Sequence, residues 1–426
     1  MGGVFHRTIV PMPRSGKLPA VPDELITTPE SLAAVCEHLR AAKRFAFDTE
    51  FIGENTYHPV LCLVQVATTE RVELIDPLAL PKPALQPFWD ILADPAIEKI
   101  CHAGDQDIEI AWLQGGLVPQ NVFDTQIGAG MLGIAYPTAL WRVVEYFSGT
   151  VLDKAHTYSA WNRRPLTKAQ FAYAIDDVRY LPAIHREMVQ RIESLGHLTW
   201  MTTACEDMCK EAADPVDAGK LFAKVRGAGS LNAIQLAVLR ELAALREQLA
   251  CDCDLPLRRI LKDDPLLAIA ARMPEKAAAL AAIRDVPKQL VEAYGNEFVE
   301  AVIRGQAVPK EQRPSLRAPP EDSAAVKRLA ETLWVAAQTI CLGQSVTPAL
   351  VTCQNEILSL ARILHKKKPP LTSLEKHPIM LGWRRECLGE KLLQFLQQNL
   401  RIDLAMKENA LCAEFTKRSD ISSSEA

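Results

Sequence analysis

Apolar positions in the first part of the chain alternate between helical spacing and short β-rich runs. Residues 30–42 carry apolar side chains at helical intervals, with Thr28 placed to cap the helix and Pro29 at its first position. The runs that favour strands are residues 44–48, 60–68, 71–75 and 98–102. The first three are joined by links short enough for antiparallel neighbours, and the last continues into a helix. We therefore expect a mixed sheet with helices around it.

After about Leu166 the strand pattern stops and helical spacing takes over. Residues 231–249 are strongly amphipathic, and prolines separate the shorter helices that follow. The expected parts of the chain are an N-terminal extension (1–22), an α/β domain (23–226), a helical domain (227–308), a Pro-rich charged linker (309–322), a second helical domain (323–412) and a disordered tail (413–426).

Composition narrows the class of protein. A chain of 426 residues with 48% hydrophobic and 23% charged residues is globular and too long for one ordinary core. The uncharged run 332–355 is broken by Gly343 and Pro348, which indicates a helix–turn–helix rather than a membrane span, and no secretory signal is expected. The 11 scattered cysteines suit a reducing cytoplasm. The net charge of −4 does not exclude a local basic face that binds nucleic acid.

An acidic pair ends the first strand run. Asp48 and Glu50 are two residues apart, so a strand directs both side chains to one face. Their mutual repulsion costs stability unless a cation lies between them. The alternative is an ordinary strand exit with solvated acids.

Two further acidic clusters follow. Residues 102–109 pass from a strand end through Gly104 into a helix, where Asp105, Asp107 and Glu109 compete for a place near the acidic pair. Periodicity does not choose among them, and acids also occur at helix starts simply because of the helix dipole.

The last cluster is YAIDD at residues 173–177. Tyr173 and Asp177 share one helical face, so the phenol can hold a water while the carboxylate binds metal; Asp176 lies on another face. Taken together, the clusters offer the oxygen ligands that Mg²⁺ and Mn²⁺ prefer. A pair of such ions can activate a water and stabilise the leaving oxygen when a phosphodiester is hydrolysed. Each cluster alone is also common on ordinary exposed elements.

FDTEF, HAGDQD and YAIDD resemble, in order and spacing, the exonuclease motifs of the DEDD superfamily in its tyrosine subclass. The flanks TYHPVLCLVQVA, FDTQIGAGMLG and WNRRPLTKAQFAYAIDDVRYL are similar to the ribonuclease D family over residues 28–186. The resemblance implies an RNase H-like α/β fold and two divalent metal ions, Mg²⁺ or Mn²⁺. It carries metal ligation over to Asp48, Glu50, Asp107 and Asp177, with Tyr173 orienting the attacking water, and it selects Asp107 over Asp105.

Residues 231–283 resemble an HRDC domain, a helical nucleic-acid-binding module, and residues 324–399 are a candidate second copy. The expected fold class is therefore an α/β RNase H-like exonuclease domain followed by all-α HRDC-type domains. Four basic residues before the third motif are candidates for steering phosphate: Lys154, Arg163, Arg164 and Lys168. A solvated basic loop is the alternative.

The resemblance implies a 3′→5′ exoribonuclease that takes RNA with a free 3′ end, such as tRNA precursors, and releases 5′-mononucleotides. We expect a cytoplasmic monomer that does not bind membranes. One alternative is a DNA exonuclease, since a contact to a ribose 2′-hydroxyl is not visible in sequence. The other is an inactive RNA-binding scaffold, against which the intact set of acids argues.

Overall fold

The computed structural model describes residues 18–152, 160–214, 217–316, 321–366, 374–397, 400–407 and 410–417. The chain forms two compact units. The first contains the chain up to Glu50, Leu61–Ala213 and the chain from Glu321 on; the second contains Phe51–Val60 and Asp214–Pro320. We describe each unit by itself.

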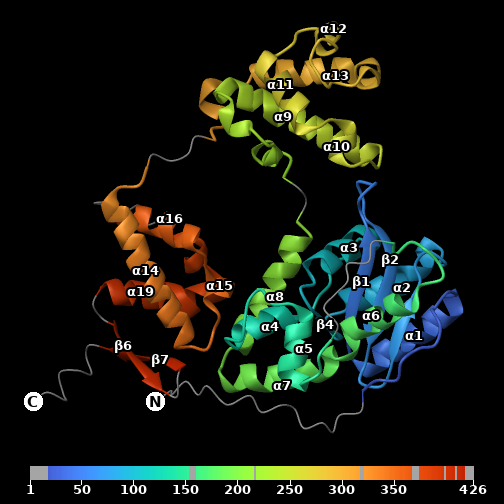
Figure 1. Ribbon diagram of the computed structural model, residues 1–426, viewed down its shortest axis with the longest axis vertical. Coiled ribbons are helices and arrows are strands. Elements are labelled where there is room, and N and C mark those ends of the chain that lie inside the picture. Colours follow the sequence, from blue (N-terminus) through green and yellow to red (C-terminus); the bar gives the residue numbers. More distant parts are fainter. Residues whose placement is uncertain are drawn as a thin grey trace, which may run out of the picture. The chain divides into compact units, whose positions relative to one another are not determined.

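The first unit is built on a five-stranded sheet with the order β3-β2-β1-β4-β5 (Figure 1). The strands are β1 (Arg44–Ile52), β2 (Val60–Ala67), β3 (Val72–Ile75), β4 (Glu98–Cys101) and β5 (Val122–Asp124). β2 and β3 are antiparallel, whereas β4 pairs in parallel with both β1 and β5. The predicted mixed sheet is confirmed, and β1 extends beyond the predicted run.

Helices flank this sheet (Figure 1). They are α1 (Pro29–Ala42), η1 (Lys82–Leu85), α2 (Gln86–Ala93), α3 (Asp105–Gly115), α4 (Thr125–Met131), α5 (Leu140–Ser148), α6 (Lys168–Arg179), α7 (Leu181–Ser194) and α8 (Leu198–Ala212). α1 begins as predicted, because the Thr28 side chain accepts a hydrogen bond from the N–H of Ser31 and Pro29 needs no such partner.

Helices near the C-terminus also belong to the first unit. They are α14 (Ala324–Leu342), α15 (Pro348–Val351), α16 (Gln354–Leu364), η5 (Pro378–Met380), α18 (Gly382–Arg384), η6 (Arg385–Gly389) and α19 (Glu390–Leu396). Their apolar side chains join one core with those of α4, α5, α7 and α8. For example, the Thr347 N–H donates to the Gly130 carbonyl at 2.8 Å, and a side chain at Gly130 would collide with Leu350. Residues 323–397 thus share the core of the first unit instead of forming one of their own.

The chain then forms an antiparallel pair of strands, β6 (Leu400–Lys407) and β7 (Ala410–Lys417). β6 and the start of β7 lie in residues 323–412, for which a helical domain was expected, so the end of that range is corrected to a strand pair. The first residues of this segment, LRID, alternate apolar and polar side chains, which is the period of a strand. The expected disordered tail, 413–426, begins inside β7, and residues 418–426 lie outside the described part.

Helices dominate the second unit. It contains η2 (Leu221–Lys224), η3 (Ala228–Ser230), α9 (Ala233–Asp252), α10 (Leu257–Ile260), α11 (Asp263–Arg272), α12 (Ala277–Leu280), α13 (Lys288–Gln306) and η4 (Lys310–Gln312). α9 and α13 approach closely because Gly305 has no side chain. A side chain at this position would collide with the Val238 backbone. The segment Phe51–Val60 is fastened to this unit, since the Tyr57 hydroxyl donates to Glu247 at 2.7 Å.

Residues 332–355 form the predicted helix–turn–helix, because α14 ends at Leu342 and α15 begins at Pro348. In the part of the chain that the structure describes, no helix is both long enough and apolar enough to cross a membrane.

Candidate active site

β1 presents two carboxylates on one face of the sheet. Phe45 and Phe47 point to the other face and are fully buried, which fixes the orientation of the strand. Asp48 and Glu50 alternate with them, and their carboxylate oxygens lie within 4.8 Å of each other and of an oxygen of Asp177. The two-residue spacing of Asp48 and Glu50 in the sequence therefore places both carboxylates in one site.

α6 supplies Asp177 together with Tyr173. The helix begins at Thr167, whose side chain and that of Gln170 form a reciprocal cap. Tyr173 and Asp177 are one turn apart, and the phenol hydroxyl donates a hydrogen bond to the Asp177 carboxylate. Asp176 faces elsewhere and forms an ion pair with Arg179 at 2.7 Å.

Asp107 reaches the same region from α3. The chain turns from β4 into α3 at Gly104, where a side chain would collide with Cys101. Asp107 is 6% exposed, and its carboxylate accepts a hydrogen bond from the Thr49 hydroxyl of β1. Its oxygens are not in the 4.8 Å group, yet its charge raises the pKa of both Asp48 and Glu50.

The acids of this site repel one another. Burial, followed by the charges of Asp177 and Asp107, raises the pKa of Glu50 to about 8. Burial, with Asp176 and Asp107, raises the pKa of Asp177 to about 8. Burial also raises the pKa of Asp107 to about 6, although hydrogen bonds from Thr49 oppose the shift. The pKa of Asp48 lies well above its usual range, first through burial and then through the other three acids.

This donor set fits a hard divalent cation. The carboxylates of Asp48, Glu50 and Asp177 converge within ligand distance of one point. Oδ2 of Asp177 is buried and has no hydrogen-bond partner among the described residues. A buried acceptor without a partner costs free energy, and a cation beside it removes both that cost and the repulsion between the acids. Oxygen-only ligands favour Mg²⁺ or Mn²⁺ over softer metals.

Comparisons with known proteins agree with this geometry. A family model described as 3′-5′ exonuclease matches residues 24–193, and an HRDC domain model matches residues 235–302. Ribonuclease D of Gluconacetobacter diazotrophicus is 35% identical over 383 residues, which cover 90% of this chain and 95% of the relative. The chain belongs to the ribonuclease D family. The crystal structure of Escherichia coli RNase D has a TM-score of 0.74 at 30% identity and covers 88% of this chain and 98% of its own.

The family assignment confirms the predicted exonuclease fold and HRDC module.

The four basic residues that were expected to steer phosphate differ in their surroundings. Arg164 makes five hydrogen bonds: two to Asp76 and one each to the carbonyls of Trp161, Arg163 and Cys62. These occupy all five N–H donors of a guanidinium, so Arg164 holds the fold together and the expectation that it steers substrate is corrected. Arg163 and Lys168 are exposed, and Lys154 lies outside the described residues.

Two residues of the ribonuclease D-like domain act behind the acids and were not identified from the sequence. Thr49 holds Asp107, as described above. Asp124 is 1% exposed and accepts hydrogen bonds from the N–H groups of Gly104 at 2.8 Å and Gln126 at 2.6 Å. It therefore joins the turn that carries Asp107 to the start of α4. An aspartate just before a helical run is a capping signal that was available in FDTQIG.

Proposed function

We propose that this ribonuclease D family member is a 3′→5′ exoribonuclease that hydrolyses RNA from a free 3′ end and releases 5′-mononucleotides. Precursors of tRNA and other small structured RNAs are the proposed substrates. The observation that carries the proposal is the convergence of Asp48, Glu50 and Asp177 within 4.8 Å, beside the Tyr173 hydroxyl. The Escherichia coli relative, an exoribonuclease involved in structured RNA processing, supports the choice of substrate.

Asp48, Glu50, Asp107 and Asp177 are the proposed ligands of two divalent ions, Mg²⁺ or Mn²⁺. Bound ions of this kind lower the pKa of an attacking water and stabilise the departing oxygen of a phosphodiester. The protein's own part is to keep four carboxylates close together despite their repulsion. β1 and the Thr49 hydroxyl achieve this, since they leave Asp48, Glu50 and Asp107 little freedom to move apart.

Tyr173 is the proposed residue that orients the attacking water. Burial and the charges of Asp177, Glu50 and Asp48 raise the pKa of its phenol, so the hydroxyl keeps its proton at neutral pH. The single O–H of this phenol donates to the Asp177 carboxylate, so Tyr173 is a poor base, and its oxygen is the atom that accepts a hydrogen bond from the water. Its contribution is therefore to position the water, while the carboxylates and their cations lower the barrier.

The reaction is tested with a short single-stranded RNA that carries a label at one end or the other. A 3′ label should appear at once as a labelled mononucleotide, whereas a 5′ label should give a ladder of shortening products. Both should require Mg²⁺ or Mn²⁺ and stop in EDTA. An endonuclease would instead release labelled fragments several nucleotides long from the 3′-labelled RNA, and that result would overturn the proposal.

The same assay with DNA of identical sequence separates the alternatives. We expect the DNA to be degraded much more slowly than the RNA. Equal rates would favour a general exonuclease, and binding without hydrolysis would favour a scaffold. The proposed monomer is tested by light scattering of the full chain. The proposed cytoplasmic location is supported by the free thiols of the ten cysteines whose side chains the structure describes.

A further inference from the structure

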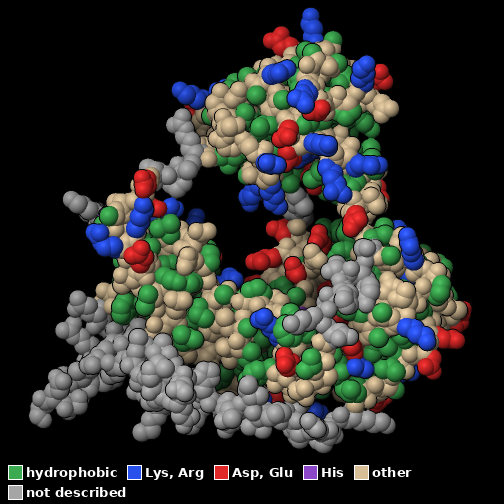
Figure 2. Space-filling model, in the orientation of Figure 1, with side chains coloured by type: hydrophobic (Ala, Val, Ile, Leu, Met, Phe, Trp, Pro, Cys, Tyr) green, Lys and Arg blue, Asp and Glu red, His purple; other side chains and the backbone are tan. Residues whose placement is uncertain are grey.

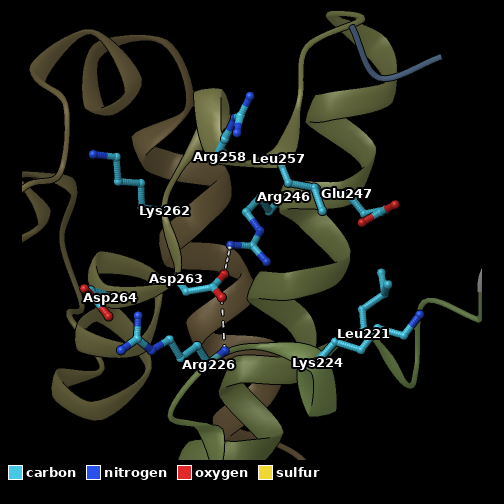
Figure 3. A pocket seen from close by; sticks show the side chains of 10 residues that line it. All are labelled: Leu221, Lys224, Arg226, Arg246, Glu247, Leu257, Arg258, Lys262, Asp263 and Asp264. Carbon is cyan, nitrogen blue, oxygen red and sulfur yellow. Dashed lines mark hydrogen bonds and ion pairs between the residues drawn. The ribbon is translucent and has the colours of Figure 1, made fainter. Parts of the chain in front are cut away.

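The second unit contains a charged pocket of ≈ 430 Å³, far in sequence from the acids of the active site (Figure 3). Its walls come from the η2 segment, the C-terminal half of α9, α10 and the start of α11. Leu221, Lys224 and Arg226 precede residues 235–302, which the HRDC family model matches. The HRDC fold alone therefore does not form this pocket, because the preceding segment supplies part of its wall.

Positive charge prevails in the pocket. Five basic side chains line it: Lys224, Arg226, Arg246, Arg258 and Lys262. Of the three acids, Asp263 forms an ion pair with Arg246 at 2.7 Å, and Glu247 accepts a hydrogen bond from Tyr57 at 2.7 Å. Within the described ranges, no carboxylate forms an ion pair with the other four cations, although the Arg258 guanidinium donates to the Glu54 carbonyl at 3.1 Å. Figure 2 shows Lys and Arg side chains gathered on the second unit near α10.

Arg246 at the back of the pocket is incompletely satisfied. Its side chain is only 8% exposed, and one terminal nitrogen donates to Asp263 and to the Leu261 carbonyl at 3.1 Å. Its Nε is buried and has no hydrogen-bond partner among the described residues. A buried charged donor without an acceptor costs free energy. Arg246 also lines the pocket, so an oxyanion bound there lies beside a guanidinium whose hydrogen bonds are incomplete.

We propose that this pocket binds a phosphodiester group of the RNA backbone, at a distance along the chain from the hydrolytic site; the choice of RNA rests on the proposed function. Guanidinium and ammonium groups bind phosphate oxygens strongly. Two or more of them around one pocket bind a phosphate more tightly than a single surface cation does. None of the ten side chains that line it, all in the described part of the chain, is aromatic. The pocket therefore lacks a stacking surface for a base, and it recognises the charge of the phosphate independently of the RNA sequence.

Two double variants of the full chain test the pocket. Lys224→Glu/Lys262→Glu reverses two exposed cations of the pocket. Lys276→Glu/Lys288→Glu makes the same change in net charge at two exposed lysines of the second unit that do not line it. Arg246 is left intact, since it also holds Asp263 and Leu261.

Affinity is measured by fluorescence anisotropy in EDTA, with an RNA hairpin that has a single-stranded 3′ tail. We expect the pocket variant to bind the RNA about 10-fold more weakly at about 0.1 M salt. The slope of log K against the logarithm of the salt concentration should become smaller in magnitude by about 1–2. The control variant should lose less than about 3-fold. The uncharged variant Lys224→Gln/Lys262→Gln should lose an intermediate amount, which guards against a folding defect caused by the new acids. Equal losses in the pocket and control variants would overturn the proposal.

Inorganic phosphate and AMP distinguish a backbone site from a small-ligand site. We expect each to compete with the RNA only at millimolar concentration, because one phosphate lacks the support of neighbouring contacts. If AMP binds tightly and depends on Lys224 and Lys262 while RNA affinity does not, the RNA assignment is wrong. Hydrolysis of a trinucleotide is scored separately. Its absence in the wild type would count against the proposed function and leave the binding result untouched.

Discussion

The acids around Asp48 in the first unit and the cations around Arg246 in the second are both clusters of like charge, but they are held differently. Burial contributes most to the pKa shifts of the acids. β1 and α6 hold the carboxylates close together, so they also repel one another. Most of the cations lie on exposed side chains, where solvent and salt reduce their repulsion. Ligand binding at the acids should therefore respond to pH and affect turnover. Binding at the cations should respond to salt and affect affinity.

The largest expected effect comes from removing single acids. Asp48→Asn, Asp107→Asn and Asp177→Asn should each lower turnover roughly 1,000-fold or more, since each removes a negative charge on which the cations depend. RNA affinity in EDTA should stay within about 3-fold of wild type, because the pocket cations are unchanged. Turnover is measured under single-turnover conditions with labelled RNA.

Asp176→Asn is the matched control for Asp177→Asn. The two residues are adjacent, but Asp176 forms an ion pair with Arg179 on another face of α6. We expect it to keep turnover within about 3-fold of wild type. If an Asp48, Asp107 or Asp177 variant retains a tenth or more of the wild-type rate, that residue is not a metal ligand.

A smaller loss is expected for Tyr173→Phe. The ring still packs near Trp161, whose centroid is 6.1 Å away, but the hydroxyl that orients the water is gone. We expect kcat to fall roughly 100-fold with little change in RNA affinity, since such a loss belongs to the transition state. A change confined to KM would instead make Tyr173 a substrate-packing residue.

Local spacing accounts for the parts of the site that sequence alone could predict. Asp48 and Glu50 share a face because strands have period two, and Tyr173 and Asp177 do because helices have nearly four residues per turn. Asp107 was not distinguishable from Asp105 by spacing, since its position depends on the Thr49 hydroxyl, 58 residues away. The resemblance to a family was needed there.

Long-range partners account for most of what could not be predicted. Arg164 looked like a free cation because its partner, Asp76, is 88 residues away. The basic pocket was invisible for a similar reason, since Lys224 and Lys262 come from separate segments. Residues 323–397 show helical spacing, but spacing does not reveal which core a helix joins. β6 could not be predicted because its alternation covers only the four residues LRID, a run too short to distinguish a strand from the end of a helix.

An intermediate effect concerns pH and metal. The pKa of Glu50 is about 8 in the folded protein, above its ordinary value near 4.5, so its protonated form favours folding. That contribution is fully present below the unfolded pKa and is lost as pH rises through about 8. The metal-free protein should therefore be less stable at pH 9 than at pH 6, relative to a Glu50→Gln variant that lacks the charge.

Mg²⁺ should reverse this loss, because it needs the ionised carboxylates and neutralises them. We expect saturating Mg²⁺ to raise the melting temperature more at pH 9 than at pH 6, by roughly 1–2 °C for each kcal/mol of repulsion relieved in a chain of this size. Thermal unfolding in EDTA and in Mg²⁺ at both pH values measures it. An equal rise at both would mean that these acids are not the ones that bind the ion.

The smallest expected effect concerns the exposed cations near α6. Arg163→Gln/Lys168→Gln should raise KM for RNA about 3-fold, leave kcat and the melting temperature unchanged, and lose its effect at high salt, since exposed charges are screened. Arg164→Gln is the contrasting variant: it leaves the Asp76 carboxylate, 3% exposed, without its ion pair, so it should lower the free energy of unfolding by about 3–5 kcal/mol. Steady-state kinetics at two salt concentrations, with urea unfolding of each variant, separates the two roles. If Arg163→Gln/Lys168→Gln lowered stability without changing KM, these residues would be structural, as Arg164 is.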